Sequence, residues 1–137
     1  HFIQNVGFDK YIEVNTLAAN LKKQYNKIFL LGFSVGATIA WRCCETSLYS
    51  GIIGCYGSRI RNFTNLNPVC PTLLLFAKEN SFDVAETANK LQYTKNLSLL
   101  VFDASHGFLD PYSKSYDDYQ RKKAEIVITR FINQHIK

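Results

Sequence analysis

The chain of 137 residues is 47% hydrophobic and 20% charged, which predicts one soluble globular domain over residues 1–137 and excludes a disordered or fibrous chain. Its formal net charge is +5, but the basic residues are scattered among acidic neighbours, so solvated helix faces are favoured over nucleic-acid binding. Because no apolar run approaches the roughly 18 residues that span a membrane and no signal-peptide pattern opens the chain, we expect a cytoplasmic protein with neither a membrane nor a nucleic-acid partner.

The first segment starts at His1, and the sequence contains no methionine. Residue 1 is therefore not a translation start, and we expect further residues upstream of it.

From Asp9 to Tyr25, apolar residues recur near helical spacing, which predicts an amphipathic helix. The residues expected on its apolar face are Ile12, Leu17, Ala18, Leu21 and Tyr25.

An apolar run from Lys27 to Leu31 predicts a strand, and Gly32-Phe33-Ser34-Val35-Gly36 follows it directly. This is the G-x-S-x-G nucleophile elbow, a sharp strand-to-helix turn that holds a serine hydroxyl clear of the backbone. We expect both glycines to be required, because a Cβ atom at either position would collide across so tight a turn. The next helix, over about Val35–Thr46, directs its N-terminus at Ser34, and the Val35 N–H is the candidate donor to an oxyanion. Its expected buried stripe is Ala37, Ile39, Ala40 and Cys43.

Three more apolar runs predict strands over Ile52–Tyr56, Leu73–Ala77 and Leu97–Phe102. Their near-continuous apolar character is typical of strands that are buried on both faces. Residues 58–68 are polar and lack periodicity, which predicts a loop with at most one helical turn. Since four strands alternate with helices, we expect an α/β domain with a parallel sheet covered on both faces.

Two helices are predicted in the second half of the chain. One runs from Asp83 to about Leu91 and begins with a capping box, in which Asp83 accepts from a first-turn N–H and the Glu86 side chain reaches back. The other runs from about Ser115 to the C-terminus. Its expected apolar side consists of Tyr116, Tyr119, Ala124, Val127, Ile128, Phe131 and Ile132.

The four cysteines, Cys43, Cys44, Cys55 and Cys70, show no C-x-x-C spacing, and three of them fall in apolar segments. Buried free thiols are therefore favoured over disulfides. Zinc is less favoured still, because the histidines are few and none has metal-ligand spacing. We predict neither a metal nor a cofactor.

Reactive groups in open parallel sheets gather at the carboxyl ends of the strands. His106 directly follows the last strand and is the histidine that does not lie near a chain end, so it is the candidate base. A serine is a poor nucleophile without such a base, which favours catalysis by His106 over a surface-loop role. Glu79 is the favoured acid to orient the imidazole, and Asp83, which has a structural role as helix cap, is the alternative. The order Ser, acid, His is that of α/β-hydrolases.

Four segments together look like the C-terminal two-thirds of a dienelactone hydrolase-like protein: Gly32–Gly36, Cys55–Ile60, Pro71–Phe76 and Ser105–Pro111. The resemblance implies an α/β-hydrolase-like three-layer sandwich with a mostly parallel sheet, whose N-terminal strands are missing from this chain. It also implies a hydrolase that cleaves a small-molecule ester, lactone or thioester. Those missing strands would supply the second oxyanion N–H and part of the substrate pocket.

The sequence departs from this family at two positions. Dienelactone hydrolases proper use a cysteine nucleophile, whereas this chain has Ser34. The family's aspartate matches Asn80, so either Glu79 or Asp83 has taken its role or the triad is weakened. Asn80 therefore motivates a second hypothesis, a non-catalytic α/β-hydrolase-like domain that binds a ligand or a protein partner.

Three further side chains have two interpretations each. Arg59 and Arg61 would suit a substrate carboxylate, although a solvated loop is the favoured interpretation. Tyr56 would line the pocket or pack at the end of its strand. The natural substrate and the oligomeric state are not predicted.

Overall fold

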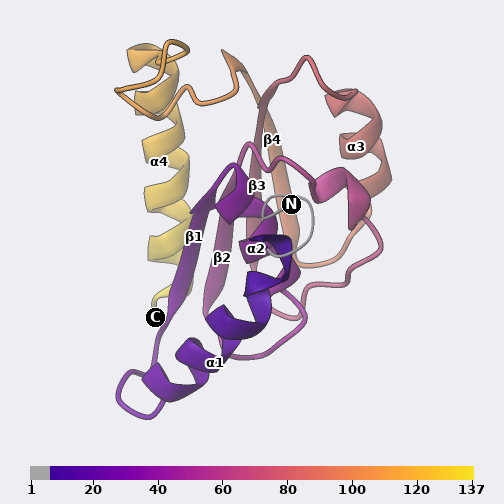
Figure 1. The fold of residues 1–137 in the computed structure, drawn as a ribbon. Helices are drawn as coiled ribbons and strands as arrows, with labels where there is room; N and C mark the ends of the chain where they lie inside the picture. The colour runs from indigo at the N-terminus through magenta and orange to yellow at the C-terminus, as the bar shows by residue number, and fades with distance from the viewer. Residues whose placement is uncertain (1–6) are drawn as a thin grey trace.

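A four-stranded parallel sheet lies at the centre of the computed structural model, which describes residues 7–137; His1 lies outside the described residues. The strand order is β1-β2-β3-β4, so each strand pairs with its neighbour in sequence (Figure 1). The expected α/β class with a parallel sheet is confirmed. The strands are β1 (Phe29–Phe33), β2 (Gly51–Cys55), β3 (Thr72–Lys78) and β4 (Leu97–Ser105).

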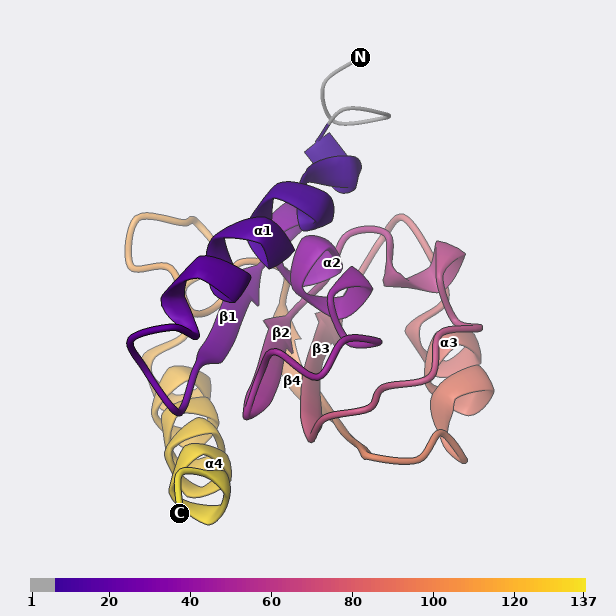
Figure 2. The same cartoon turned by 90° about the horizontal axis from the view of Figure 1, so that it is seen from below.

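Helices cover both faces of this sheet and give three layers. Helix α4 (Asp118–His135) lies on one face, and the other three lie on the opposite face (Figure 2). These three are α1 (Tyr11–Leu21), which a short 3-10 helix η2 (Gly7–Lys10) precedes, α2 (Val35–Arg42) and α3 (Val84–Leu91). A 3-10 turn η3 (Ile60–Asn62) is the single helical turn expected within the loop after β2.

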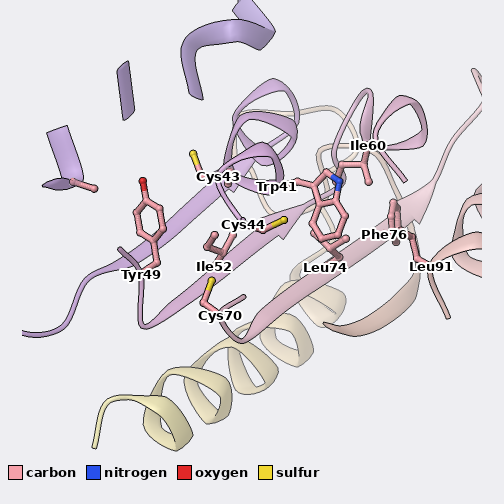
Figure 3. Packing of buried hydrophobic residues seen from close by; sticks show 12 residues of the cluster. Trp41, Cys43, Cys44, Tyr49, Ile52, Ile60, Cys70, Leu74, Phe76 and Leu91 are labelled. Atoms are coloured by element: carbon pink, nitrogen blue, oxygen red, sulfur yellow. The ribbon is translucent and has the colours of Figure 1, made fainter. Parts of the chain in front are cut away.

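Side chains of the central strands alternate between two buried clusters, one on each face, as the period of two along a strand requires. Ile52 and Leu74 join the cluster beneath α1, α2 and α3, whereas Ile53 and Leu75 join the cluster beneath α4. Figure 3 shows the first cluster around Trp41, whose indole is fully buried. Its Nε1–H donates to the Phe63 carbonyl at 2.8 Å, so the one polar atom of the ring is satisfied.

The predicted apolar face of α1 was wrong at four of its five positions. Ile12 and Leu17 are each 59% exposed, and Ala18 alone of the expected set is buried. Two apolar stripes run along this helix, and the stripe that packs on the core begins one residue earlier. The helix also ends at Leu21, which leaves Tyr25 in the following turn. The residues that face the core are Tyr11, Val14 and Ala18.

Strand β1 lies two residues further along the chain than predicted. Its register with β2 pairs Gly32 with Gly54 and Phe33 with Cys55, so the ladder continues through the first half of the elbow. Ser34 therefore stands at the end of the hydrogen-bonded strand. The helix after it is shorter than expected and stops at Arg42.

The two C-terminal helices differ from the prediction in their details. Asp83 accepts from the Glu86 N–H at 3.1 Å, as expected, but the Glu86 carboxylate pairs with Lys90 at 3.2 Å and leaves the reciprocal half of the capping box unmade. Helix α4 begins at Asp118 because the Asp117 side chain accepts from a first-turn N–H. Tyr119 is 68% exposed, so its placement on the apolar side was wrong.

Within residues 7–137, no helix has both the length and the apolar character needed to cross a bilayer.

Candidate active site

Ser34 occupies a strained turn between β1 and α2. Its φ of 55° and ψ of −118° lie in a region that L-residues rarely adopt. The Ser34 N–H still donates to the Cys55 carbonyl at 2.9 Å, and the Ser34 carbonyl accepts from the Ala37 N–H at 3.0 Å. The residue is thus fixed by the strand on one side and by the helix on the other, as an elbow requires.

The two glycines of the elbow are not equivalent. A Cβ atom on Gly32 would lie 2.1 Å from the carbonyl oxygen of Gly36, so Gly32 is required for the backbone to pass itself. A Cβ atom on Gly36 would meet no heavy atom within 4 Å. The expectation that both glycines are needed for space was therefore wrong for Gly36, because a Cβ atom at this position would point into open space.

His106 lies in the loop directly after β4. Gly107 follows it with a φ of +89°, and a Cβ atom there would approach Ser113 Oγ to 2.9 Å, so a glycine is needed at this position. The chain then turns so that Phe108 is fully buried. The imidazole packs against Tyr56, with ring centroids 4.8 Å apart. The turn and the aromatic contact together fix the direction of the ring.

Two hydrogen bonds connect side chains from three different loops. Ser34 Oγ lies 2.9 Å from His106 Nε2, and His106 Nδ1 lies 2.7 Å from Glu79 Oε2. The Glu79 side chain is 8% exposed and that of His106 is 37% exposed, so the acid is buried behind the imidazole. A carboxylate can only accept, which places the proton of a neutral imidazole on Nδ1 and leaves Nε2 to accept from the serine hydroxyl.

The other two candidates for the acid point elsewhere. Asp83 is exposed and serves as the N-cap of α3, which is the structural role that the sequence predicted for it. Asn80 is also exposed, although the resemblance matched it with the family's aspartate. Of the residues weighed for this position, Glu79 is the one that the structure brings to His106.

The Val35 N–H stands at the first position of α2, directly after the nucleophile. Among residues 7–137, no acceptor forms a hydrogen bond with it. Free N–H groups at a helix N-terminus attract negative charge, and the helix dipole adds to this effect. Within residues 7–137, the Val35 N–H, which is the expected oxyanion donor, therefore lies next to the serine without a hydrogen-bond acceptor.

A cavity of about 540 Å³ opens beside Ser34. Its walls combine aromatic and aliphatic side chains with the carboxylate of Asp110, and neither Arg59 nor Arg61 lines it. Tyr56 does line it, and burial raises the pKa of this phenol to about 12, so it stays neutral. The lining residues are Phe33, Ser34, Tyr56, His106, Gly107, Leu109, Asp110 and Ser113.

Ser58 is a site residue that the sequence analysis missed. Its Oγ lies 2.9 Å from Ser34 Oγ, and its carbonyl accepts from Arg61 Nη1 at 2.6 Å. The guanidinium of Arg61 also stacks over the Phe82 ring, with its carbon 4.5 Å from the ring centroid. The position of Ser58 directly after the strand-end Tyr56-Gly57 pair was a signal for this location, since strand ends gather at one edge of the sheet.

The cysteines offer no alternative nucleophile at this site. All four are free and buried, and burial raises the pKa values of Cys44 and Cys55 to about 12. Both therefore remain thiols at neutral pH, whereas a thiolate is the nucleophilic form. Within residues 7–137, no three histidine, cysteine or acidic side chains are grouped so that they could hold a metal ion.

Comparisons with known proteins bear on the family and the fold of this chain. The model of the dienelactone hydrolase family matches residues 4–136. The "Uncharacterized protein YczH" of Bacillus subtilis (strain 168) is 49% identical over 89 residues, which are 63% of this chain and 44% of YczH. A crystal structure called "Putative Dienelactone Hydrolase from Klebsiella pneumoniae subsp. pneumoniae MGH 78578" superposes with a TM-score of 0.71 at 17% identity, over 90% of this chain and 60% of that chain. The chain thus spans less than two-thirds of either protein.

Proposed function

The chain belongs to the dienelactone hydrolase family, whose model matches residues 4–136, and we propose from this that the protein hydrolyses a small-molecule ester, lactone or thioester with Ser34 as its nucleophile. The observation that carries the proposal is the continuous pair of hydrogen bonds from Ser34 through His106 to Glu79. A serine held in a strained elbow and bonded to an oriented imidazole is the arrangement that acyl transfer requires.

Acylation begins when His106 Nε2 takes the proton of Ser34 Oγ as the oxygen attacks the substrate carbonyl carbon. The Glu79 carboxylate, 2.7 Å from Nδ1, holds the ring in its tautomer and offsets the charge of the imidazolium. The negative charge of the tetrahedral intermediate develops near the Val35 N–H at the N-terminus of α2. His106 then gives its proton to the leaving oxygen or sulfur, and the acyl group stays on Ser34.

Deacylation repeats the sequence with water in place of the serine. His106 accepts a proton from the water as its oxygen attacks the acyl carbon, and the second intermediate forms beside the same Val35 N–H. Collapse of that intermediate releases the acid, and Ser34 recovers its proton from His106. The resting state is restored, so no residue is consumed in a turnover.

The cavity favours a small acyl or alkoxy group with an apolar surface. Its volume of about 540 Å³ falls within the roughly 300–1,000 Å³ of typical small-molecule sites. Phe33 and Leu109 supply apolar contacts in the cavity wall, and Tyr56 adds a neutral ring. These walls support the class of small-molecule substrates over polymers.

The competing hypothesis, a non-catalytic binding domain, depended on Asn80 in the position of the acid. Asn80 is exposed, and the buried Glu79 carboxylate bonds to His106 instead. This contact supports the catalytic hypothesis over the binding domain. A cytoplasmic location stays a prediction from the sequence.

An active-site serine probe tests the proposal. We expect a fluorophosphonate to label the full-length protein stoichiometrically at Ser34, and a small activated ester to be hydrolysed at a rate that the probe abolishes. Peptide mapping by mass spectrometry locates the label, and Ser98→Ala, on the exposed surface of β4, is the matched control. Absence of both labelling and hydrolysis in the folded protein would exclude the proposed function.

A further inference from the structure

Ser58 contacts the nucleophile through both its backbone and its side chain. Its N–H donates to the Ser34 carbonyl at 3.4 Å, and its Oγ lies 2.9 Å from Ser34 Oγ. Ser58 follows β2, whereas His106 follows β4, so the nucleophile receives two polar partners from different strand ends. Ser58 does not line the cavity itself.

The direction of the hydroxyl–hydroxyl bond follows from an account of donors and acceptors. In the reactive state, the His106 imidazole is neutral, its Nδ1–H donates to Glu79, and Nε2 must accept the Ser34 hydroxyl proton. Ser34 then has no second proton to offer, so in its bond with Ser58 it can only accept. The Ser58 hydroxyl is therefore the donor.

We propose that Ser58 is a positioning residue for the nucleophile, an inference that rests on the proposed function. Its O–H donates to Ser34 Oγ and holds this oxygen toward His106, while the second lone pair stays available for attack. As His106 removes the proton, negative charge grows on Ser34 Oγ, and a hydrogen bond to a charged oxygen is stronger than one to a neutral oxygen. Ser58 thus stabilises the transition state more than the resting state, and transfers no proton itself.

The surrounding loop holds Ser58 in place for this role. Arg61 Nη1 donates to the Ser58 carbonyl at 2.6 Å while its guanidinium stacks on Phe82, in the loop that also carries Glu79. The next residue is tied to α2, because the Arg59 N–H donates to the buried hydroxyl of Thr38 at 3.0 Å. Ser58 is thus linked to the loop of the acid and to the helix of the nucleophile.

Removal of the hydroxyl tests the inference. We expect Ser58→Ala to lower both kcat and the second-order rate constant of fluorophosphonate labelling by about 10- to 100-fold, the range expected for one hydrogen bond to a charged group. KM should stay within about twofold, because Ser58 lies outside the cavity lining. Ser58→Thr keeps the hydroxyl and should restore at least a third of the wild-type rate. Ser98→Ala, which removes an exposed hydroxyl far along the chain, should change neither parameter.

The outcomes separate this inference from the proposed function. If the wild-type protein reacts with the probe and Ser58→Ala reacts equally fast, the positioning role is excluded and the proposed function stands. A rate that Ser58→Thr fails to restore, in a variant with wild-type thermal unfolding, would equally exclude a role for the hydroxyl. A wild-type protein that neither labels nor hydrolyses esters would instead exclude the proposed function.

Discussion

Glu79 and Asp83, four residues apart in one loop, have separate roles: the Glu79 carboxylate bonds to His106 Nδ1 at 2.7 Å, and the Asp83 carboxylate caps α3 at 3.1 Å. The Glu79 side chain is buried, whereas Asp83 is exposed. The two carboxylates weighed for the acid therefore differ in environment, and conservative variants distinguish their functions.

Replacement of Glu79 by glutamine should lower kcat for a small activated ester by about 10³- to 10⁴-fold, because the amide no longer offsets the imidazolium charge and allows the wrong tautomer. Asp83→Asn should leave kcat within about twofold and stability nearly unchanged, since asparagine caps helices as well as aspartate does. Steady-state kinetics of the two variants provides the measurement. The reverse pattern would assign the acid to Asp83.

Ser34→Ala and His106→Ala should each reduce ester hydrolysis by at least about 10⁴-fold, and the double variant should be no worse than either single one. In the proposed mechanism the two residues act as a unit, so removal of one leaves the other without a function. The rates are compared by single-turnover kinetics, with circular dichroism as the check of folding. Additive losses in the double variant would contradict a shared proton-transfer step.

The two elbow glycines should respond differently to alanine. Gly32→Ala should lower the free energy of unfolding by about 3 kcal/mol or more, because its Cβ would lie 2.1 Å from a backbone oxygen. Gly36→Ala, the matched variant in α2, should change it by at most about 1 kcal/mol, in the stabilising direction expected for alanine in a helix. Urea denaturation gives both values, and equal losses would contradict the difference in contacts.

Substrate charge should matter because Asp110 lines the cavity and neither arginine of the nearby loop does. We expect kcat/KM for a neutral ester to exceed that for a matched ester carrying a carboxylate by about 3- to 10-fold at low salt, with the difference shrinking as ionic strength rises. Asp110→Asn should reduce this preference while keeping the side-chain oxygen that accepts from the Tyr112 N–H at 2.9 Å. A preference for the anionic ester would contradict this prediction.

Stability should fall in alkaline solution because the cysteines are buried. Burial raises the pKa values of Cys43 to about 11 and of Cys44 and Cys55 to about 12, from 9.0. Above pH 9 the unfolded thiols lose protons that the folded thiols keep, so the free energy of unfolding decreases as pH rises, by up to about 1.4 kcal/mol per pH unit for each thiol. Urea denaturation between pH 8 and about pH 11 measures this slope, and Cys55→Ala should make it shallower. A flat profile would contradict the burial of the thiols.

Much of this arrangement could be predicted from the sequence because it depends on local patterns. The apolar runs gave the four strands and their alternation with helices, and the cap at Asp83 pointed to Glu79 as the free carboxylate. Ser58 escaped prediction because its approach to the nucleophile depends on the turn at Tyr56, whose φ of 40° is unusual for a non-glycine residue. The strand end predicts the edge of the sheet at which Ser58 lies, but it does not predict this angle.

The face of α1 was mispredicted for a different reason. Apolar residues lie on two sides of this helix, and contacts with residues far away in the chain decide which side packs on the core. One is the bond from the Tyr49 hydroxyl to Asn15 at 2.8 Å, on the side of the helix that faces the sheet. Tertiary packing of this kind overrides a local periodicity.

The hydrogen bond between Ser34 and His106 joins residues that are 72 positions apart in the chain. The loops that carry Ser34, Glu79 and His106 follow β1, β3 and β4, so the site is complete only after β4 has paired with β3. The elbow also depends on a neighbouring strand, because the Ser34 N–H donates to the Cys55 carbonyl at the end of β2. Reactivity with a serine probe would therefore report the native pairing of the whole sheet, whereas circular dichroism reports its secondary-structure content.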